Sequence, residues 1–180
     1  MAFVYRAHDL HKGDAASLHS MTPIERKLWD AFLMVHSINP AMGLVLPIPG
    51  LTFRVIRAAL LDIRIIPKSV ADSVLYAVAP QVCHGSRRLD FGLVSAIDGA
   101  NRWYAVECDG HDFHERTKEQ ARSDKARDRE LARDGIVTIR FAGSEIWKDA
   151  AECMNEIGRI LGGDWQRQAE IEKFGEVRHG

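Results

Sequence analysis

Two carboxylates stand one residue apart in the segment 103–109, which reads Trp-Tyr-Ala-Val-Glu-Cys-Asp. Aromatic and β-branched residues in this run predict a strand, and positions i and i+2 of a strand point to the same face. Glu107 and Asp109 therefore lie side by side, where like charges repel unless a cation separates them. Hard oxygen ligands of this kind suit a divalent ion such as Mg²⁺. The pair predicts a metal site.

A third carboxylate, Asp90, comes from the segment 88–93, where Leu89, Phe91 and Leu93 alternate with polar residues or glycine. This alternation predicts a strand with one apolar face. The turn at 98–101 then joins the two strands as a hairpin, which brings Asp90 beside Glu107. Three carboxylates on two paired strands make a credible metal site. The alternative is a set of acids on a solvated sheet face.

A helix is predicted to begin at Thr22-Pro23, with Glu25 three residues past the N-cap. Threonine and glutamate at this spacing form a capping box, and proline suits the first helical position. Apolar residues follow at helical spacing until Asn39-Pro40 ends the helix. Glu25 has two interpretations here, a metal ligand or only a partner in the cap.

Further along, the pattern predicts a charged helix at 115–133 stopped by Gly135, a short strand at 136–141, and a helix capped by Ser144. Residues 51–66 fit a helix or a strand, and the role of 41–79 stays open. The order of elements predicts an α/β fold with a small central mixed sheet flanked by helices. We expect an N-terminal arm at 1–20, one domain at 21–162 and a charged tail at 163–180.

The composition is that of a globular protein, with 180 residues, 46% of them hydrophobic, and a net charge of −1. This charge argues against a nonspecific nucleic-acid binder, but it allows an acidic site beside a local basic groove. Three cysteines form no disulfide framework, and no run approaches the roughly 20 apolar residues that span a bilayer. We therefore expect a cytoplasmic protein that has no membrane partner.

Several short motifs, read in order, resemble a known family. They are Arg-Leu-Asp-Phe at 88–91, Val-Glu-Cys-Asp-Gly-His-Asp-Phe-His at 106–114, Asp-Lys-Ala-Arg-Asp at 124–128, Gly-Ile-Val at 135–137 and Arg-Phe at 140–141. Together with the helix at 22–29, this series resembles an uncharacterised nuclease-like branch related to the very-short-patch-repair endonucleases. That branch lies in the PD-(D/E)XK restriction-endonuclease-like superfamily, and the resemblance spans about residues 22–160.

The resemblance implies a restriction-endonuclease-like fold and a metal-dependent endonuclease that hydrolyses DNA in repair or restriction, with Mg²⁺ or Mn²⁺. Asp90 is then the main metal ligand, Glu107 stands at the acidic motif position, and Glu25 binds the metal through water. Asp109 occupies the place of the motif lysine, which is a departure from the family pattern. The resemblance leaves the lysine's role to His114, Lys118 or Lys125, with His114 suited to act as a base near neutral pH.

Basic residues recur along the charged helix, and we expect Lys118, Arg122, Lys125 and Arg127 to contact the phosphates of DNA. The competing interpretation is a solvated helix in which these residues pair with neighbouring acids. The sequence leaves open whether the protein is a monomer or a homodimer.

Three other functions compete with a nuclease. A module that kept the fold but lost catalysis would bind nucleic acid or a protein without cutting, and the missing lysine favours it. Cys83-His84 with Cys108, His111 and His114 could bind zinc, although the spacing matches no known finger. Cys108 could act as a nucleophile, but alternation points it toward the core, where thiols are usually inert.

Overall fold

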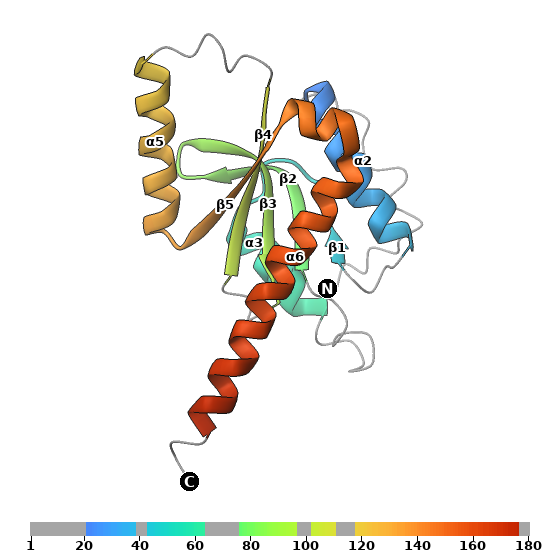
Figure 1. Cartoon of the computed structure of the whole chain (residues 1–180), viewed down its shortest axis with the longest axis vertical. Coiled ribbons are helices and arrows are strands. Elements are labelled where there is room, and N and C mark those ends of the chain that lie inside the picture. Colours follow the sequence, from blue (N-terminus) through green and yellow to red (C-terminus); the bar gives the residue numbers. More distant parts are fainter. Residues whose placement is uncertain (1–20, 39–42, 64–75, 97–101, 111–117, 177–180) are drawn as a thin grey trace.

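The computed structural model describes residues 21–38, 43–63, 76–96, 102–110 and 118–176. These residues form a five-stranded sheet in the order β1-β2-β3-β4-β5, with four helices around it (Figure 1). The outer pairs β1–β2 and β4–β5 are parallel and the inner pairs are antiparallel. The elements are α2 (Pro23–Ile38), β1 (Gly43–Val45), α3 (Phe53–Ile63), β2 (Tyr76–His84), β3 (Arg87–Ser95), β4 (Arg102–Asp109), α5 (Lys118–Arg133), β5 (Ile136–Ala142) and α6 (Gly143–Glu176).

Helices cover both faces of this sheet, which gives it two hydrophobic cores. On one face, α2 and α6 lie side by side (Figure 1) and form the α2–α6 core with one set of strand residues. On the other face, α3 and Leu131 of α5 form the α3–α5 core. The predicted α/β fold with a central mixed sheet flanked by helices is confirmed. Among the described residues, no helix is both long and apolar enough to span a membrane.

The predicted hairpin is confirmed, because β3 and β4 pair antiparallel from Ser95–Arg102 to Phe91–Val106. The single apolar face predicted for β3 is wrong. Phe91 packs in the α2–α6 core, whereas Leu89, two residues earlier, packs in the α3–α5 core. Strict alternation would place both on one face. The strand therefore changes face at Asp90, between them.

The neighbouring strand β2 changes face at the same level. Val78 packs in the α2–α6 core and Val82 in the α3–α5 core, although residues four positions apart in a regular strand share one face. Gln81 lies between the cross-strand pairs Pro80–Phe91 and Val82–Leu89, and its φ is +52°. A positive φ is uncommon in a residue with a side chain, and here it coincides with the break in the regular alternation of β2. Asp90 therefore lies at the level where the side chains of both strands change from one core to the other.

The capping box of α2 is confirmed. Thr22 N donates to Glu25 Oε2 at 3.2 Å, and Glu25 N donates to Thr22 Oγ1 at 3.3 Å. Glu25 and Trp29, one turn apart, are both buried. The ring of Trp29 stacks on Phe91 with centroids 6.0 Å apart, which fixes α2 against β3 next to Asp90. The first helix therefore holds Glu25 over the same part of the sheet.

The later elements follow the prediction, except that α6 begins at Gly143, before the predicted cap Ser144, and extends further than predicted. Gly135 ends α5 with a φ of +73°, a conformation that suits a glycine C-terminal stop. The last helix bends at Asp149, whose φ and ψ are non-helical and whose Oδ1 accepts from Glu152 N at 3.0 Å. It continues beyond Gly162-Gly163 to Glu176, so the residues predicted as a charged tail begin as helix. The undecided stretch 41–79 contributes β1, α3 and the start of β2.

Close packing at Gly92 gives a test of the two-faced sheet. An added Cβ there would lie 2.8 Å from Val82 Cγ2 and 3.0 Å from a ring carbon of Phe53. We expect Gly92→Ala to lower the free energy of unfolding by about 1–3 kcal/mol, as overpacking does. Gly158→Ala on α6, which meets no atom within 4 Å, should be neutral or stabilising. Urea unfolding of both variants measures this, and equal stabilities would contradict the packing described.

Candidate metal centre

The candidate site lies where β3 and β4 stop pairing, beyond the Phe91–Val106 pair, and we call this place the fork. β4 continues past it on its other side, pairing with β5 from Glu107–Arg140 to Asp109–Ala142. In the fork, Cys108 N donates to Asp90 Oδ2 at 2.8 Å. The carboxylate of Asp90 thus accepts the Cys108 N–H, beyond the last β3–β4 residue pair. This bond holds Asp90 in the fork.

Burial raises the pKa of Asp90, and the charge of Asp109 raises it further. The Cys108 N–H and the guanidinium of Arg127 oppose this shift because they stabilise the carboxylate. The other carboxylate oxygen, Oδ1, has no hydrogen-bond partner in the described part of the chain. Asp90 is therefore anchored through one oxygen and has the other available to a ligand.

Glu107 is only 4% exposed, and Arg127 Nη2 on α5 donates to its Oε1. Burial raises the pKa of Glu107 to about 7, and the nearby charge of Asp90 adds to the rise, while Arg127 opposes it. The Nε of Arg127 is buried and, within the described residues, lacks a hydrogen-bond partner. Glu107 and Arg127 thus form a buried ion pair at the fork. The effect of the Asp90 charge on the pKa of Glu107 agrees with the predicted proximity of these two residues.

Asp109 is half-buried, and its Oδ1 lies 3.4 Å from Nη1 of Arg140. The other terminal nitrogen of Arg140, Nη2, pairs with Asp128 on α5. Arg140 therefore connects the end of β4 with α5. Sequence reasoning noticed Arg140 only as part of a motif and gave it no role in the site.

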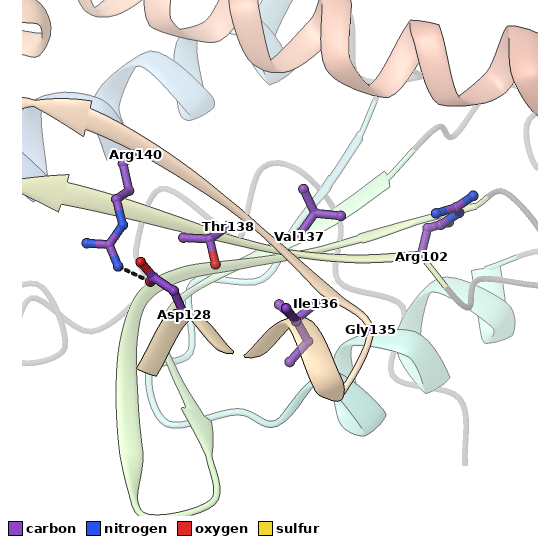
Figure 2. Close-up of a pocket in the computed structure, with 8 residues that line it drawn as sticks. Arg102, Asp128, Gly135, Ile136, Val137, Thr138 and Arg140 are labelled. Atoms are coloured by element: carbon purple, nitrogen blue, oxygen red, sulfur yellow. Dashed lines mark hydrogen bonds and ion pairs between the residues drawn. The ribbon is translucent and has the colours of Figure 1, made fainter. Parts of the chain in front are cut away.

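Figure 2 shows that Arg140 also lines an open pocket of about 670 Å³ along β5, with Asp128 beside it and Arg102 at the far end. None of the four predicted metal ligands lines this pocket. The pocket is thus separate from the fork, and Arg140 is the residue that they share. Its lining residues are Arg102, Asp128, Ala132, Gly135, Ile136, Val137, Thr138 and Arg140.

Glu25 approaches the fork from α2 and is 8% exposed. Burial raises its pKa, and the charge of Asp90 raises it further. Besides its bond in the cap, Oε2 accepts from Gln81 Nε2 at 2.7 Å. Gln81 is 2% exposed and was missed by sequence reasoning. The available signal was one amide within the otherwise apolar run from Leu75 to Cys83.

The donor chemistry at the fork fits a hard divalent cation. Glu25, Asp90 and Glu107 supply carboxylate oxygens, and the charge of Asp90 raises the pKa of both glutamates. In the described part of the chain, however, no three His, Cys, Asp or Glu side chains stand together ready to bind a metal. Arginines pair with Glu107 and Asp109. The acids are therefore a candidate ligand set whose counter-charges are supplied by the protein itself.

Other predicted residues lie apart from the fork or outside the described residues. His111 and His114 fall outside, as does the side chain of Lys118. Arg122 and Lys125 are exposed on α5, whereas Arg127 turns inward to Glu107. Arg127 therefore belongs to the fork, whereas Arg122 and Lys125 face solvent.

The thiol alternative is disfavoured by the position of Cys108. Its side chain packs against the α2–α6 core, as alternation predicted, and burial beside acids raises its pKa. The thiolate that a nucleophile requires is thereby suppressed. For the zinc alternative, Cys83 is half-buried and the adjacent His84 bonds Asp134 Oδ2 at 2.7 Å. The proposed histidine ligands His111 and His114 fall outside the described residues.

Residues 69–161, just over half of the chain, match the family model REase_MTES_1575. The chain belongs to this restriction-endonuclease-like family. The match includes the fork, with Asp90, Glu107, Asp109 and Arg127, and begins after the helix that carries Glu25. No curated protein and no solved structure matches the chain. The family indicates a nuclease, and the five-stranded α/β architecture is consistent with a restriction-endonuclease-like fold.

The raised pKa of Glu107 predicts a pH-dependent stability. Because this pKa rises from 4.5 to about 7 on folding, the folded protein loses stability as the pH increases through that interval. Glu107→Gln does not titrate, so its stability relative to wild type should improve by on the order of 3 kcal/mol between pH 5 and pH 8. Urea unfolding in EDTA measures the difference. Asp30→Asn, an exposed acid on α2, is the matched control, and a pH-independent difference for Glu107→Gln would contradict the assignment.

Proposed function

We propose that this protein is a divalent-metal-dependent endodeoxyribonuclease that hydrolyses DNA phosphodiester bonds. The observation that carries the proposal is the pair of neighbouring carboxylates at the fork, the half-buried Asp90 and the buried Glu107, in a chain of the restriction-endonuclease-like family. Like charges close together are unfavourable without positive charge nearby. Arg127 supplies part of that charge through its pair with Glu107, and a divalent cation between the two acids would supply more. Mg²⁺ or Mn²⁺ suits these hard oxygen donors.

In this proposal Asp90 and Glu107 hold the metal, Glu25 reaches it through water, and Asp109 lies beside them. A bound divalent ion would lower the pKa of the attacking water and neutralise charge on the phosphate. The protein contributes orientation. The Cys108 N–H fixes Asp90, while Thr22 and Gln81 fix Glu25.

Arg127 is our candidate for the positive charge that the motif lysine supplies elsewhere in the superfamily, because Asp109 stands at that position. Its guanidinium already contacts Glu107 and has a buried Nε with no partner among the described residues. A guanidinium presents several donors to phosphate oxygens at once. Arg127 thus combines a positive charge, a position at the fork and a spare donor.

Other roles remain as the sequence suggested them. We propose His114 as a base for the attacking water and Lys118 as a second catalytic cation, with Arg122, Lys125 and Lys118 contacting the DNA backbone. Arg122 and Lys125 are exposed, as such contacts require. The resemblance to the very-short-patch-repair branch supports a role in DNA repair, with restriction as the alternative pathway.

A plasmid-nicking assay tests the proposal directly. Supercoiled DNA is incubated with purified protein and Mg²⁺, Mn²⁺ or EDTA. We expect nicking with either metal, none in EDTA, and a loss of at least about 100-fold in Asp90→Asn, because the variant lacks the charge that holds the cation. Asp90→Asn keeps an oxygen for the Cys108 N–H, so its fold is expected to survive. Asp30→Asn should cut like wild type.

Cutting that survives Asp90→Asn would place the site elsewhere. Absence of cutting in every metal, with DNA bound equally in Mg²⁺ and EDTA, would favour the alternative of an inactive nuclease-fold module. The arginine partners of Glu107 and Asp109 give that alternative some structural support, because they neutralise the acids without a metal.

The role of Arg127 is tested by Arg127→Ala and Arg127→Lys, with Arg129→Ala, an exposed arginine of the same helix, as control. We expect Arg127→Ala to lower the nicking rate at pH 7 by about 100-fold, because one charged donor to the phosphate is lost. Removing Arg127 also raises the pKa of Glu107, so part of the rate should return at pH 8.5. Arg127→Lys should retain more activity than the alanine variant. A wild-type rate in Arg127→Ala would exclude the role.

A further inference from the structure

Gln81 has a backbone conformation that, among the described residues, no other non-glycine residue shares. Its φ is +52° in the middle of β2, in the left-handed region that side chains disfavour. The residue is also 2% exposed, so solvent does not stabilise its amide. Strain of this kind persists only where the surroundings impose it, and it is concentrated at functional sites.

Backbone contacts from the segment before α3 hold Gln81 in place. Gly50 N donates to Gln81 O at 2.9 Å, and Cys83 N donates to Leu51 O at 2.8 Å. The neighbouring pairs Pro80–Phe91 and Val82–Leu89 place Gln81 across from Asp90. The unusual conformation therefore occurs beside the fork.

The two ends of the Gln81 amide have different environments. Nε2 donates to Glu25 Oε2 at 2.7 Å, whereas Oε1 is buried and has no hydrogen-bond partner in the described part of the chain. Buried polar atoms in folded proteins nearly always have a partner, and an amide oxygen has two lone pairs to satisfy. The Glu25 contact fixes which end is the oxygen, because a carboxylate accepts and the NH₂ group donates. Gln81 thus holds an unused acceptor beside Glu25 and across the strand pair from Asp90.

We propose that Gln81 is a neutral oxygen ligand of the cation held by Asp90 and Glu107, either directly or through a water of the cation's shell. The inference rests on the proposed function, since it concerns the same cation. Side-chain amide oxygens are ordinary ligands of hard divalent ions. A neutral ligand adds an oxygen to the site without adding another negative charge to acids that already repel one another. The Glu25 contact orients the amide and the carboxylate together.

Mn²⁺ titration calorimetry on the full chain, without DNA, tests the proposal. Gln81→Met has a similar length but no oxygen, and it should weaken Mn²⁺ binding by about tenfold or more. Gln81→Glu keeps an oxygen and adds charge, so it should bind Mn²⁺ at least as tightly as wild type. The same variant should have a lower melting temperature in EDTA, because a fourth acid joins Glu25, Asp90 and Glu107, and Mn²⁺ should restore it. Gln166→Met, at an exposed position of α6, is the matched control.

A purely structural role for Gln81 predicts the reverse order. Gln81→Glu loses the donor to Glu25 and adds repulsion, so it would then bind Mn²⁺ more weakly than Gln81→Met. That order, or wild-type affinity in Gln81→Met, overturns the proposal for Gln81. The proposed function still stands in that case if the wild type binds Mn²⁺ and Asp90→Asn does not. Absence of Mn²⁺ binding in wild type overturns both.

Discussion

Burial of several carboxylates beside one another is the constraint on which this structure depends. Asp90, Glu107 and Glu25 all have raised pKa values, for which burial is the first cause. A protein interior screens charge poorly, so such a group must be hydrogen-bonded, paired or protonated. Each acid has a dedicated partner: a backbone N–H for Asp90, an arginine for Glu107, and an amide with a helix cap for Glu25. The surrounding elements are arranged to supply these partners.

The arginines connect the acids to elements that lie far away in the sequence. Arg127 pairs α5 with the end of β4, and Arg140 links Asp109 to Asp128 of α5. Removing one partner of a buried ion pair leaves an uncompensated charge, which is strongly unfavourable. The same contacts that position α5 therefore also keep the acids ionisable. The same arginine contacts therefore determine both how α5 packs and how the acids of the fork are neutralised.

This arrangement also bears on the missing motif lysine. An acid, Asp109, stands in the strand where a cation is expected, and the described cations near the fork come instead from α5 and β5. The positive charge thus comes from elements other than the strand that carries the motif. β4 supplies carboxylate oxygens, and the neighbouring α5 and β5 supply guanidinium groups. A nuclease needs both, acids to hold a metal and a cation for the phosphate. Membership of the restriction-endonuclease-like family is compatible with this exchange.

The sequence alone determined the features that depend on local chemistry and short periodicity. The Thr22–Glu25 capping box, the β3–β4 hairpin, the Gly135 stop and the adjacency of Asp90 and Glu107 were all predicted, because each follows from turn residues, caps or alternation. Only the tertiary structure decided the change of face at Gln81 and Asp90, the pairing of Arg127 and Arg140 with the acids, and the position of Gln81 against Glu25. These features join residues up to 56 positions apart, and one of them depends on a positive φ that no local pattern signals. Long-range burial and charge pairing, which local propensity does not contain, determined them.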